Sequence, residues 1–403
     1  MKKSRIDALI MEQARLETVT RQTVEAFQLE KLNELLAREK RRGGFYAGLP
    51  ERIGNLSQLA CLPFTTDEEL AHNAPGILLT SQAEIQRVLS DATSGTTGAA
   101  KRVFYTEKDC ADTVGLFMAG LGEFVFPGSV TMICMPFSGP FGLGELIARA
   151  IENLGARPLK VGYYRSYGEL KAVLEEERPD TFVGMPVQLL GMLRYCGAGS
   201  LKRALVSGDA CPDSVTAACE EMLGTRLFPH YGSREMGLGG AICCQAHAGM
   251  HLRENHVIAE IVDEAGKAVP HGETGELVIT TIGMEAMPLI RYRTGDYTRI
   301  LPGVCPCGSQ VLRLDKLHRK GEGGSILALD EALFPLEGIL DFFAERSDTG
   351  LTVTVLTDGS TEQAQIRARI ETAMPGCSVI LRIRKANDGD YPLYQGKRIL
   401  LRT

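Results

Sequence analysis

The feature that most constrains the fold is an alternation of short apolar runs with helical stretches between residues 90 and 311. Runs rich in β-branched residues occur at 130–135, 181–183, 203–206 and 275–280, and a helical pattern covers 144–154. Glycine and proline turns separate these segments. The alternation predicts an α/β protein with substantial sheets.

The length and the local texture predict two domains. A chain of 403 residues exceeds one small core, because domains commonly hold about 100–200 residues. Residues 6–40 carry leucines at helical spacing, which predicts packed N-terminal helices. A charged and then glycine-rich segment at 312–324 is typical of a hinge. We therefore expect a large multi-sheet domain at 1–315 and a small, mobile α+β domain at 316–403.

The composition excludes some classes of function. The formal net charge is -6, whereas a protein that neutralises nucleic-acid phosphates needs a basic surface, so we expect no nucleic-acid partner. The apolar stretch at 114–137 is interrupted by Glu123 and Pro127, and a membrane span needs about 18 apolar residues, so we expect no membrane partner. No leader pattern follows Met1, and the eleven scattered cysteines resemble reduced thiols. These features predict a cytoplasmic protein.

The segment 93–101, TSGTTGAAK, has the composition of a phosphate-binding loop. Glycines let the backbone approach an anion, hydroxyl and amide groups donate to phosphate oxygens, and lysine adds a positive charge. The spacing differs from that of the Walker loop. A flexible turn is the alternative. The candidate phosphate-binding residues are Thr93, Ser94, Gly95, Thr96, Thr97, Gly98 and Lys101.

Three cysteines and a histidine form a candidate zinc site. Cys305 and Cys307 flank a proline in a turn, and Cys244 and His251 are seven positions apart. Three sulfurs and one imidazole satisfy tetrahedral Zn²⁺. Cys243 and His247 are rival ligands, and ordinary reduced cysteines are the alternative.

Several segments, in order along the chain, resemble motifs of the acyl-adenylating superfamily, and two of them resemble the phenylacetate-CoA ligases in particular. The phosphate-loop segment is similar to the signature of the superfamily, and LPFTTDEEL at 62–70 and QLEKL at 28–32 are similar to phrases of the ligases. The other matches are SGDA at 207–210, YGSRE at 231–235, RYRTGD at 291–296 and GK at 396–397. The resemblance covers residues from about 25 to the C-terminus.

The resemblance implies an enzyme that uses ATP, Mg²⁺ and CoA to activate a small carboxylic acid. Lys397 would catalyse the first step, by placing an ammonium beside the negative charge that develops at the α-phosphate. Glu235 would hold Mg²⁺, a hard cation that prefers oxygen ligands, and Asp296 would accept hydrogen bonds from ribose. The nucleotide would further contact Ser207, Gly208, Asp209, Tyr231, Gly232 and Ser233, with Tyr231 stacked on adenine. Taken singly, each of these residues also fits an ordinary loop or core position.

The resemblance also gives expectations for the acid, the zinc and the assembly. The segment 136–144 stands where similar enzymes have a loop beside the acyl pocket, so an apolar or aromatic acid is expected. The pocket candidates are Phe137, Ser138, Phe141 and Met185, which ordinary core packing would also explain. Some relatives bind structural zinc at a similar cysteine segment, and a homodimer is expected by analogy.

The hinge region departs from the family pattern, which leaves the acceptor open. Arg319 or Lys320 stands near the usual hinge arginine, with Glu322 in place of the acidic residue, and a downstream Arg-Gly pair is absent. Because this domain rotates in similar enzymes to build the thiol site, the adenylation step is better supported than the CoA step. The alternatives are an adenylating enzyme with another acceptor (a carrier protein, an amine or a cofactor hydroxyl) and a non-catalytic nucleotide-binding regulator.

Overall fold

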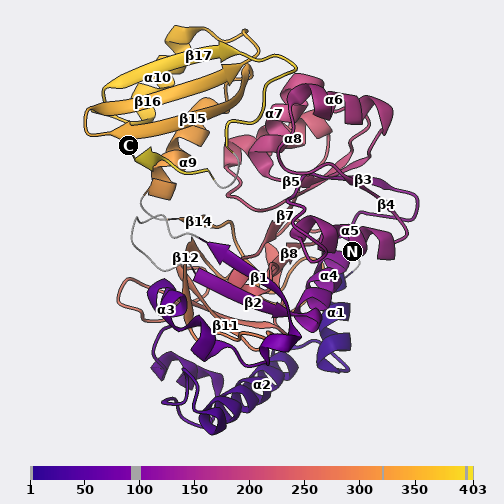
Figure 1. Cartoon of the computed structure of the whole chain (residues 1–403), viewed down its shortest axis with the longest axis vertical. Coiled ribbons are helices and arrows are strands. Elements are labelled where there is room, and N and C mark those ends of the chain that lie inside the picture. The colour runs from indigo at the N-terminus through magenta and orange to yellow at the C-terminus, as the bar shows by residue number, and fades with distance from the viewer. Residues whose placement is uncertain (1–2, 92–100, 320–321, 395–397, 403) are drawn as a thin grey trace. The chain divides into compact units, whose positions relative to one another are not determined.

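The computed structural model describes residues 3–91, 101–319, 322–394 and 398–402, which form two compact units (Figure 1). The first unit contains Met1–Glu123 and His230–Leu317, and the second contains Phe124–Pro229 and His318–Thr403. One boundary therefore falls after Leu317, two residues beyond the expected domain end. The independent movement of residues 316–403 stays a prediction.

Helices make up most of the N-terminal part of the first unit. Thr20 caps the long helix α2 at its start, and Gly43 ends it in the left-handed conformation. Thr66 and Glu69 form a capping box that fixes the first turn of α3. The elements are α1 (Arg5–Ala14), α2 (Arg21–Arg42), the 3₁₀ helix η1 (Leu56–Cys61), α3 (Asp67–Ile77), the 3₁₀ helix η2 (Gln82–Glu84) and α4 (Glu107–Leu121). The expected N-terminal helices are thus α1 and α2.

The strands of the first unit hold the segments that carry most of the motifs. β1 (Ile85–Asp91) and β2 (Lys101–Thr106) pair antiparallel, and the expected phosphate loop connects them in sequence. A second antiparallel group has the order β10 (Val257–Val262), β11 (Gly275–Thr281) and β12 (Tyr292–Thr298). A third contains the end of β7 (Phe228–Tyr231), β8 (Ala241–Cys243), β9 (Met250–Leu252) and β13 (Arg313–Leu314). The short helix η3 (Arg234–Met236) follows β7.

The second unit contains a parallel sheet in the order β4-β3-β5-β6-β7. Its strands β3 (Val130–Ile133), β5 (Thr181–Gly184) and β6 (Arg203–Val206) lie where the apolar runs predicted strands, and β4 covers Arg157–Lys160. The intervening helices are α5 (Leu143–Asn153), α6 (Tyr167–Glu176), α7 (Pro186–Cys196) and α8 (Asp213–Leu223). This strand–helix alternation confirms the predicted α/β class.

The C-terminal segment of the second unit adds a four-stranded sheet in the order β17-β16-β15-β18. Its elements are β14 (His318–Arg319), α9 (Glu322–Leu333), β15 (Ile339–Ser347), β16 (Gly350–Thr357), α10 (Gln363–Ala373), β17 (Val379–Lys385) and β18 (Leu401–Arg402). Figure 1 shows β15, β16 and β17 side by side at the yellow end of the chain. Leu329, Phe342 and Leu400 are buried in one core with residues of α7 and α8. Part of the glycine-rich segment expected as a hinge is helical, because α9 begins at Glu322.

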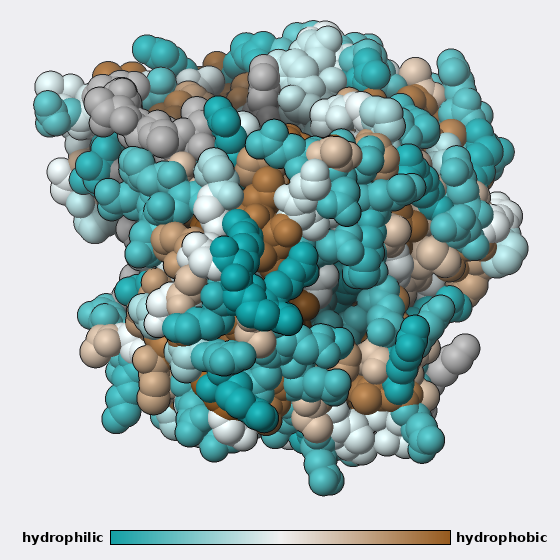
Figure 2. Space-filling view, turned by 60° about the horizontal axis from the view of Figure 1, so that its bottom comes forward, coloured by the Kyte–Doolittle hydropathy of each residue, from teal (hydrophilic) through white to brown (hydrophobic). Residues whose placement is uncertain are grey.

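Among the described residues, no helix is long and apolar enough to cross a membrane. Hydrophilic residues cover most of the face shown in Figure 2, with hydrophobic ones in separate spots. None of the eleven cysteines, all of which lie in the described part of the chain, forms a disulfide.

Candidate active site

Two residues expected at the adenosine part of a nucleotide lie together in the first unit. Tyr231, the last residue of β7, donates a hydrogen bond of 2.9 Å from its hydroxyl to Oδ2 of Asp296 in β12. Burial, and then the charge of Asp296, raise the pKa of Tyr231 well above its ordinary value, so it remains a donor. Gly295 has φ +71°, which a residue with a side chain rarely adopts, so glycine allows the bulge in β12 before Asp296.

The segment 232–238, which follows Tyr231, forms a tight turn. A Cβ added at Gly232 would lie 2.3 Å from the carbonyl oxygen of Leu238, so only glycine fits there. The amides of Met236 and Leu238 both donate to the carbonyl of Ser233. This turn and η3 direct the buried carboxylate of Glu235 toward β2.

Glu235 forms an ion pair with Lys101, the last residue of the expected phosphate segment. Lys101 Nζ lies 2.6 Å from Oε1 of Glu235 and 3.0 Å from Oδ1 of Asp67. Burial acts to lower the pKa of Lys101, but Glu235 and Asp67 outweigh it and the pKa is raised. The structure thus brings the expected metal ligand and the expected phosphate lysine into direct contact.

The turn expected to contact adenine lies in the second unit, after β6. Ser207 is buried, and its amide donates to the carbonyl of Gly184. Gly208 has φ +89°, and Oδ2 of Asp209 accepts a 2.8 Å hydrogen bond from the amide of Arg398. This turn therefore contacts the residue that follows Lys397 in the sequence.

One of the expected pocket residues lies beside this turn. A Cβ added at Gly208 would lie 3.5 Å from Cγ of Met185, which precedes α7. Phe137 packs against Gly144, where an added Cβ would meet its ring at 2.8 Å. Phe141 lies under the guanidinium of Arg149, 5.3 Å from the ring centroid, and Ser138 is exposed. The contact with Gly208 places Met185 next to the turn at 207–209.

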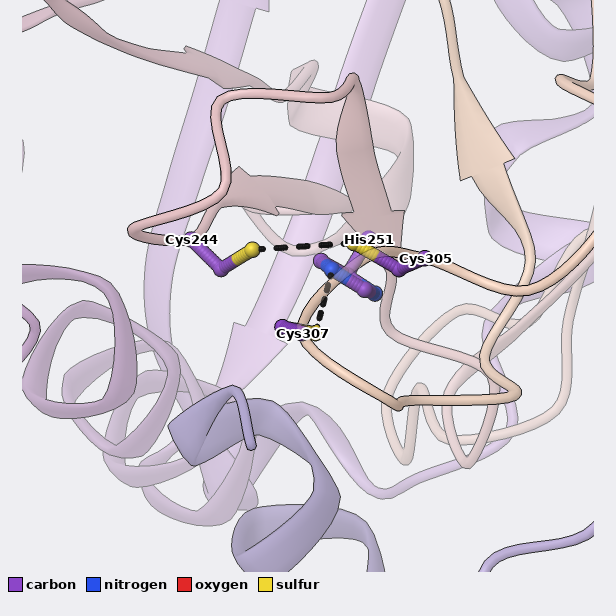
Figure 3. A group of neighbouring side chains, drawn as sticks. All are labelled: Cys244, His251, Cys305 and Cys307. Carbon is purple, nitrogen blue, oxygen red and sulfur yellow. Dashed lines mark hydrogen bonds between the residues drawn. The ribbon is translucent and has the colours of Figure 1, made fainter. Parts of the chain in front are cut away.

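The cysteine and histidine side chains expected to bind metal converge in the first unit (Figure 3). Their ligand atoms all lie within 4.8 Å of one another, and all four residues are buried. Sγ of Cys244 lies 3.8 Å from Sγ of Cys305, and Sγ of Cys307 lies 3.7 Å from Nε2 of His251. Burial, with a contribution from Arg313, lowers the pKa of His251 to about 4. The imidazole is therefore neutral and has a lone pair to donate.

The rival metal ligands contact each other instead of joining this group. Sγ of Cys243 lies 3.7 Å from Nδ1 of His247 and donates to the carbonyl of Cys244. The structure therefore favours the set of four expected from the sequence.

Several expected site residues lie outside the described part of the chain. They are the phosphate-loop residues 93–98 and the catalytic candidate Lys397. Arg319 belongs to β14, but its side chain is not among those described.

Two clusters of ionised side chains were not predicted from the sequence motifs. Asp67 and Tyr292 contact Lys101, although both stand in the quoted segments 62–70 and 291–296. In the second unit, the buried Arg398 is held by Asp330 in α9 and Asp341 in β15. An arginine adjoining the terminal Gly-Lys pair was the only signal for the second group, because its partners are 68 and 57 residues away.

Comparisons with known proteins identify the class. The sequence matches the family model described as AMP-binding enzyme over residues 91–286. The fold is similar to that of a 2-hydroxyisobutyryl-CoA ligase in the postadenylation state, with a TM-score of 0.74 and 18% identity over 94% of this chain and 89% of that one. The fold is thus that of an adenylate-forming CoA ligase, and residues 91–286 match the AMP-binding enzymes.

Sequence relatives identify the family within that class. The chain is 30% identical over 341 residues to the phenylacetate-coenzyme A ligase of Thermus thermophilus, covering 76% of this chain and 72% of that protein. It is 31% identical over 285 residues to the phenylacetate-coenzyme A ligase of Aromatoleum evansii, covering 68% of this chain but 63% of that protein, less than two thirds. The chain belongs to the phenylacetate-CoA ligase family.

Proposed function

We propose that this chain uses ATP to adenylate a carboxylic acid and then transfers the acyl group to CoA. One observation carries the proposal: the short segment from Tyr231 to Glu235 contacts Asp296 at one end and Lys101 at the other. The first unit thereby holds a carboxylate for ribose, an aromatic ring for adenine and an acid–lysine pair for phosphates.

The chemistry has two steps. A carboxylate oxygen attacks the α-phosphorus of ATP, an acyl–oxygen–phosphorus bond forms, and the bond to the β-phosphate breaks to release pyrophosphate. The sulfur of CoA then attacks the acyl carbon, and AMP leaves with the bonding electrons. The first step increases negative charge on phosphate oxygens, so fixed cations nearby lower its barrier. Lys101 supplies one such cation, and we assign the other to Lys397.

Glu235 fits the expected Mg²⁺ because its carboxylate offers oxygen ligands. Mg²⁺ is commonly held by one or two carboxylates together with substrate phosphates. Bound there, the ion would neutralise part of the triphosphate charge. In the structure described, Oε1 of Glu235 is paired with the Lys101 ammonium. Lys101 therefore orients this carboxylate within the buried site.

The cysteine–histidine group fits structural Zn²⁺. With Zn–S near 2.3 Å and Zn–N near 2.05 Å, a tetrahedral site requires about 3.8 Å between sulfurs and about 3.6 Å between sulfur and nitrogen. The observed 3.8 Å from Cys244 to Cys305 and 3.7 Å from Cys307 to His251 agree with these values. The metal would connect the β8–β9 hairpin to the turn before β13.

An aromatic acid is the proposed substrate class. Met185 supplies an apolar wall beside Gly208, and Phe137 and Phe141 lie in the same unit. The named relatives are phenylacetate-coenzyme A ligases, so phenylacetate is the first acid to test. A cytoplasmic location and a homodimer remain predictions.

The test is ATP–pyrophosphate exchange with phenylacetate and a panel of other acids, followed by thioester detection with CoA. Acid-dependent exchange is expected, and its absence with every acid would leave a non-catalytic nucleotide binder. Exchange without a thioester would indicate an acceptor other than CoA. Lys397→Ala should abolish exchange while ATP binding largely persists, whereas the exposed Lys267→Ala should behave like the wild type. Unchanged exchange in Lys397→Ala would remove its catalytic role.

A further inference from the structure

The Lys101 ammonium is fully occupied by acceptors in the first unit. Its three N–H groups face Oε1 of Glu235 at 2.6 Å, Oδ1 of Asp67 at 3.0 Å and the hydroxyl of Tyr292 at 3.0 Å. An ammonium has three donors and no acceptor. A phosphate oxygen can therefore bind Lys101 only if one of these three acceptors leaves.

Exposure indicates which acceptor leaves. The Glu235 side chain is 7% exposed, so releasing it would strand a buried carboxylate. The Asp67 side chain is 63% exposed, and water can solvate it as soon as it separates from Lys101. Tyr292 is buried, and its ring lies 5.7 Å from the ammonium. Asp67 is thus the acceptor that is most easily exchanged.

The local charge favours the same conclusion. Two carboxylates, Glu235 and Asp67, face one ammonium, so the group carries a net negative charge before any phosphate arrives. Unpairing Asp67 from Lys101 leaves a neutral Lys101–Glu235 pair with one free donor. A polyphosphate is attracted to that arrangement more strongly than to the complete group.

The position of Asp67 is fixed and does not depend on Lys101. It is the first residue of α3, whose start is set by the capping box of Thr66 and Glu69. The Tyr292 hydroxyl also donates to Oδ1 of Asp67. Asp67 therefore remains close enough to pair with Lys101 again after the phosphate oxygen that replaced it has left.

We propose that Asp67 is a positioning residue that competes with phosphate oxygens for the Lys101 ammonium. The ion pair between Asp67 and Lys101 breaks when the triphosphate binds. It forms again after pyrophosphate is produced, which increases the rate of pyrophosphate release. This rests on the proposed function, in that Lys101 binds the β- and γ-phosphates. No bond is made or broken by Asp67, and it does not touch the reacting atoms.

The test compares Asp67→Asn with Glu68→Gln. Asparagine keeps the shape and the acceptor for Tyr292 but removes the charge. Glu68 is the next residue of the same helix turn, so its substitution removes an equal charge and changes the helix end equally. Both purified variants are titrated with magnesium pyrophosphate and separately with AMP by calorimetry, and their melting temperatures are compared.

The expected result is a gain in pyrophosphate affinity of about three- to fivefold in Asp67→Asn, from the removal of one partly screened charge. AMP affinity should not change, and Glu68→Gln should match the wild type. In exchange assays with phenylacetate, the apparent KM for pyrophosphate should fall by the same factor in Asp67→Asn alone.

Unchanged or weaker pyrophosphate binding in Asp67→Asn would overturn the inference. So would an equal gain in Glu68→Gln, which would indicate a general effect of charge at the helix end. The titrations need no acid and no catalysis. They therefore test whether Asp67 competes with pyrophosphate even if the exchange assay refutes the proposed function. A wild-type protein that does not bind pyrophosphate would also overturn the inference.

Discussion

Replacing Arg398 with methionine should destabilise the C-terminal part of the second unit strongly. Arg398 Nη2 lies 2.9 Å from Asp330 and Nη1 lies 2.6 Å from Asp341, and all three side chains are at most 5% exposed. The guanidinium also lies 4.5 Å from the Phe342 ring centroid and 4.6 Å from that of Tyr394. Methionine keeps the apolar contacts and removes the charge.

The size of the stability loss depends on the buried charges that remain after the substitution. Removing one member of a buried ion pair commonly costs about 3–5 kcal/mol, because the partner charge is left buried without compensation. Two carboxylates are left here, so we expect the upper half of that range. An exposed pair contributes only about 0–1 kcal/mol. Arg157→Met is the matched control in the same unit, because Arg157 and Glu177 are 53% and 44% exposed.

The pH dependence of this loss can be worked out from Asp330. Burial raises its pKa from 3.8 to about 7, with Arg398 acting to lower it. A folded-state pKa above the unfolded one gives stability that is present below pH 3.8 and is lost as the pH rises through about 7. Without Arg398 the pKa of Asp330 rises further. The difference between wild type and variant should therefore widen between pH 6 and pH 8.5.

Hydrogen exchange followed by mass spectrometry measures this effect locally. Peptides from β15 and β16 should lose protection in Arg398→Met at pH 8.5, corresponding to about 4–5 kcal/mol, and lose less at pH 6. Adding Asp330→Asn should restore part of the protection. A loss in Arg398→Met no larger than that in Arg157→Met, or independent of pH, would refute the reasoning.

Three further outcomes are expected. Purified protein should contain about one zinc ion per chain by elemental analysis, and Cys305→Ser should lose it and melt at a lower temperature; equal zinc content in both would contradict the assignment. Tyr231→Phe removes the donor to Asp296 and should weaken ATP binding by about 1 kcal/mol in a calorimetric titration, with unchanged affinity arguing against this pair. Gly232→Ala forces a Cβ against the carbonyl of Leu238 and should lower both melting temperature and ATP affinity; wild-type values for both would show that the turn tolerates a side chain.

The secondary structure was readable from local patterns, and the fold class followed from their order. The runs at 130–135, 181–183 and 203–206 correspond to β3, β5 and β6, because short runs of apolar and β-branched residues fit a buried, pleated strand. The glycine-rich part of the expected hinge segment did not predict a helix, yet α9 begins at Glu322 with two glycines in its first turn. Glycine weakens a helix by only about 1 kcal/mol, which the buried Leu329 and Leu333 can offset.

The four members of the metal group were predicted from the sequence, but the local spacing did not exclude two rival ligands. Spacing offered both Cys243 and Cys244, and both His247 and His251, as ligands. Successive residues of an extended chain point to opposite sides, so only one of Cys243 and Cys244 can face the turn at 305–307. Which side faces that turn depends on the pairing of β9 with β13, where His251 is opposite Arg313. Long-range pairing of this kind is not encoded in the local spacing.

The two charge clusters that the sequence did not predict, around Arg398 and around Lys101, differ in exposure. That difference indicates which cluster is structural and which can exchange an acceptor for a ligand. Each surrounds one cation with two carboxylates from distant segments. Around Arg398 both carboxylate partners are buried, so no ligand can replace an acceptor without leaving a buried charge. Around Lys101, Glu235 is sealed while Asp67 is open to solvent, so one acceptor can leave at small cost. The same comparison of charge and exposure thus predicts that Arg398 keeps its carboxylate partners. It also predicts that Lys101, in β2, can exchange Asp67 for a phosphate oxygen.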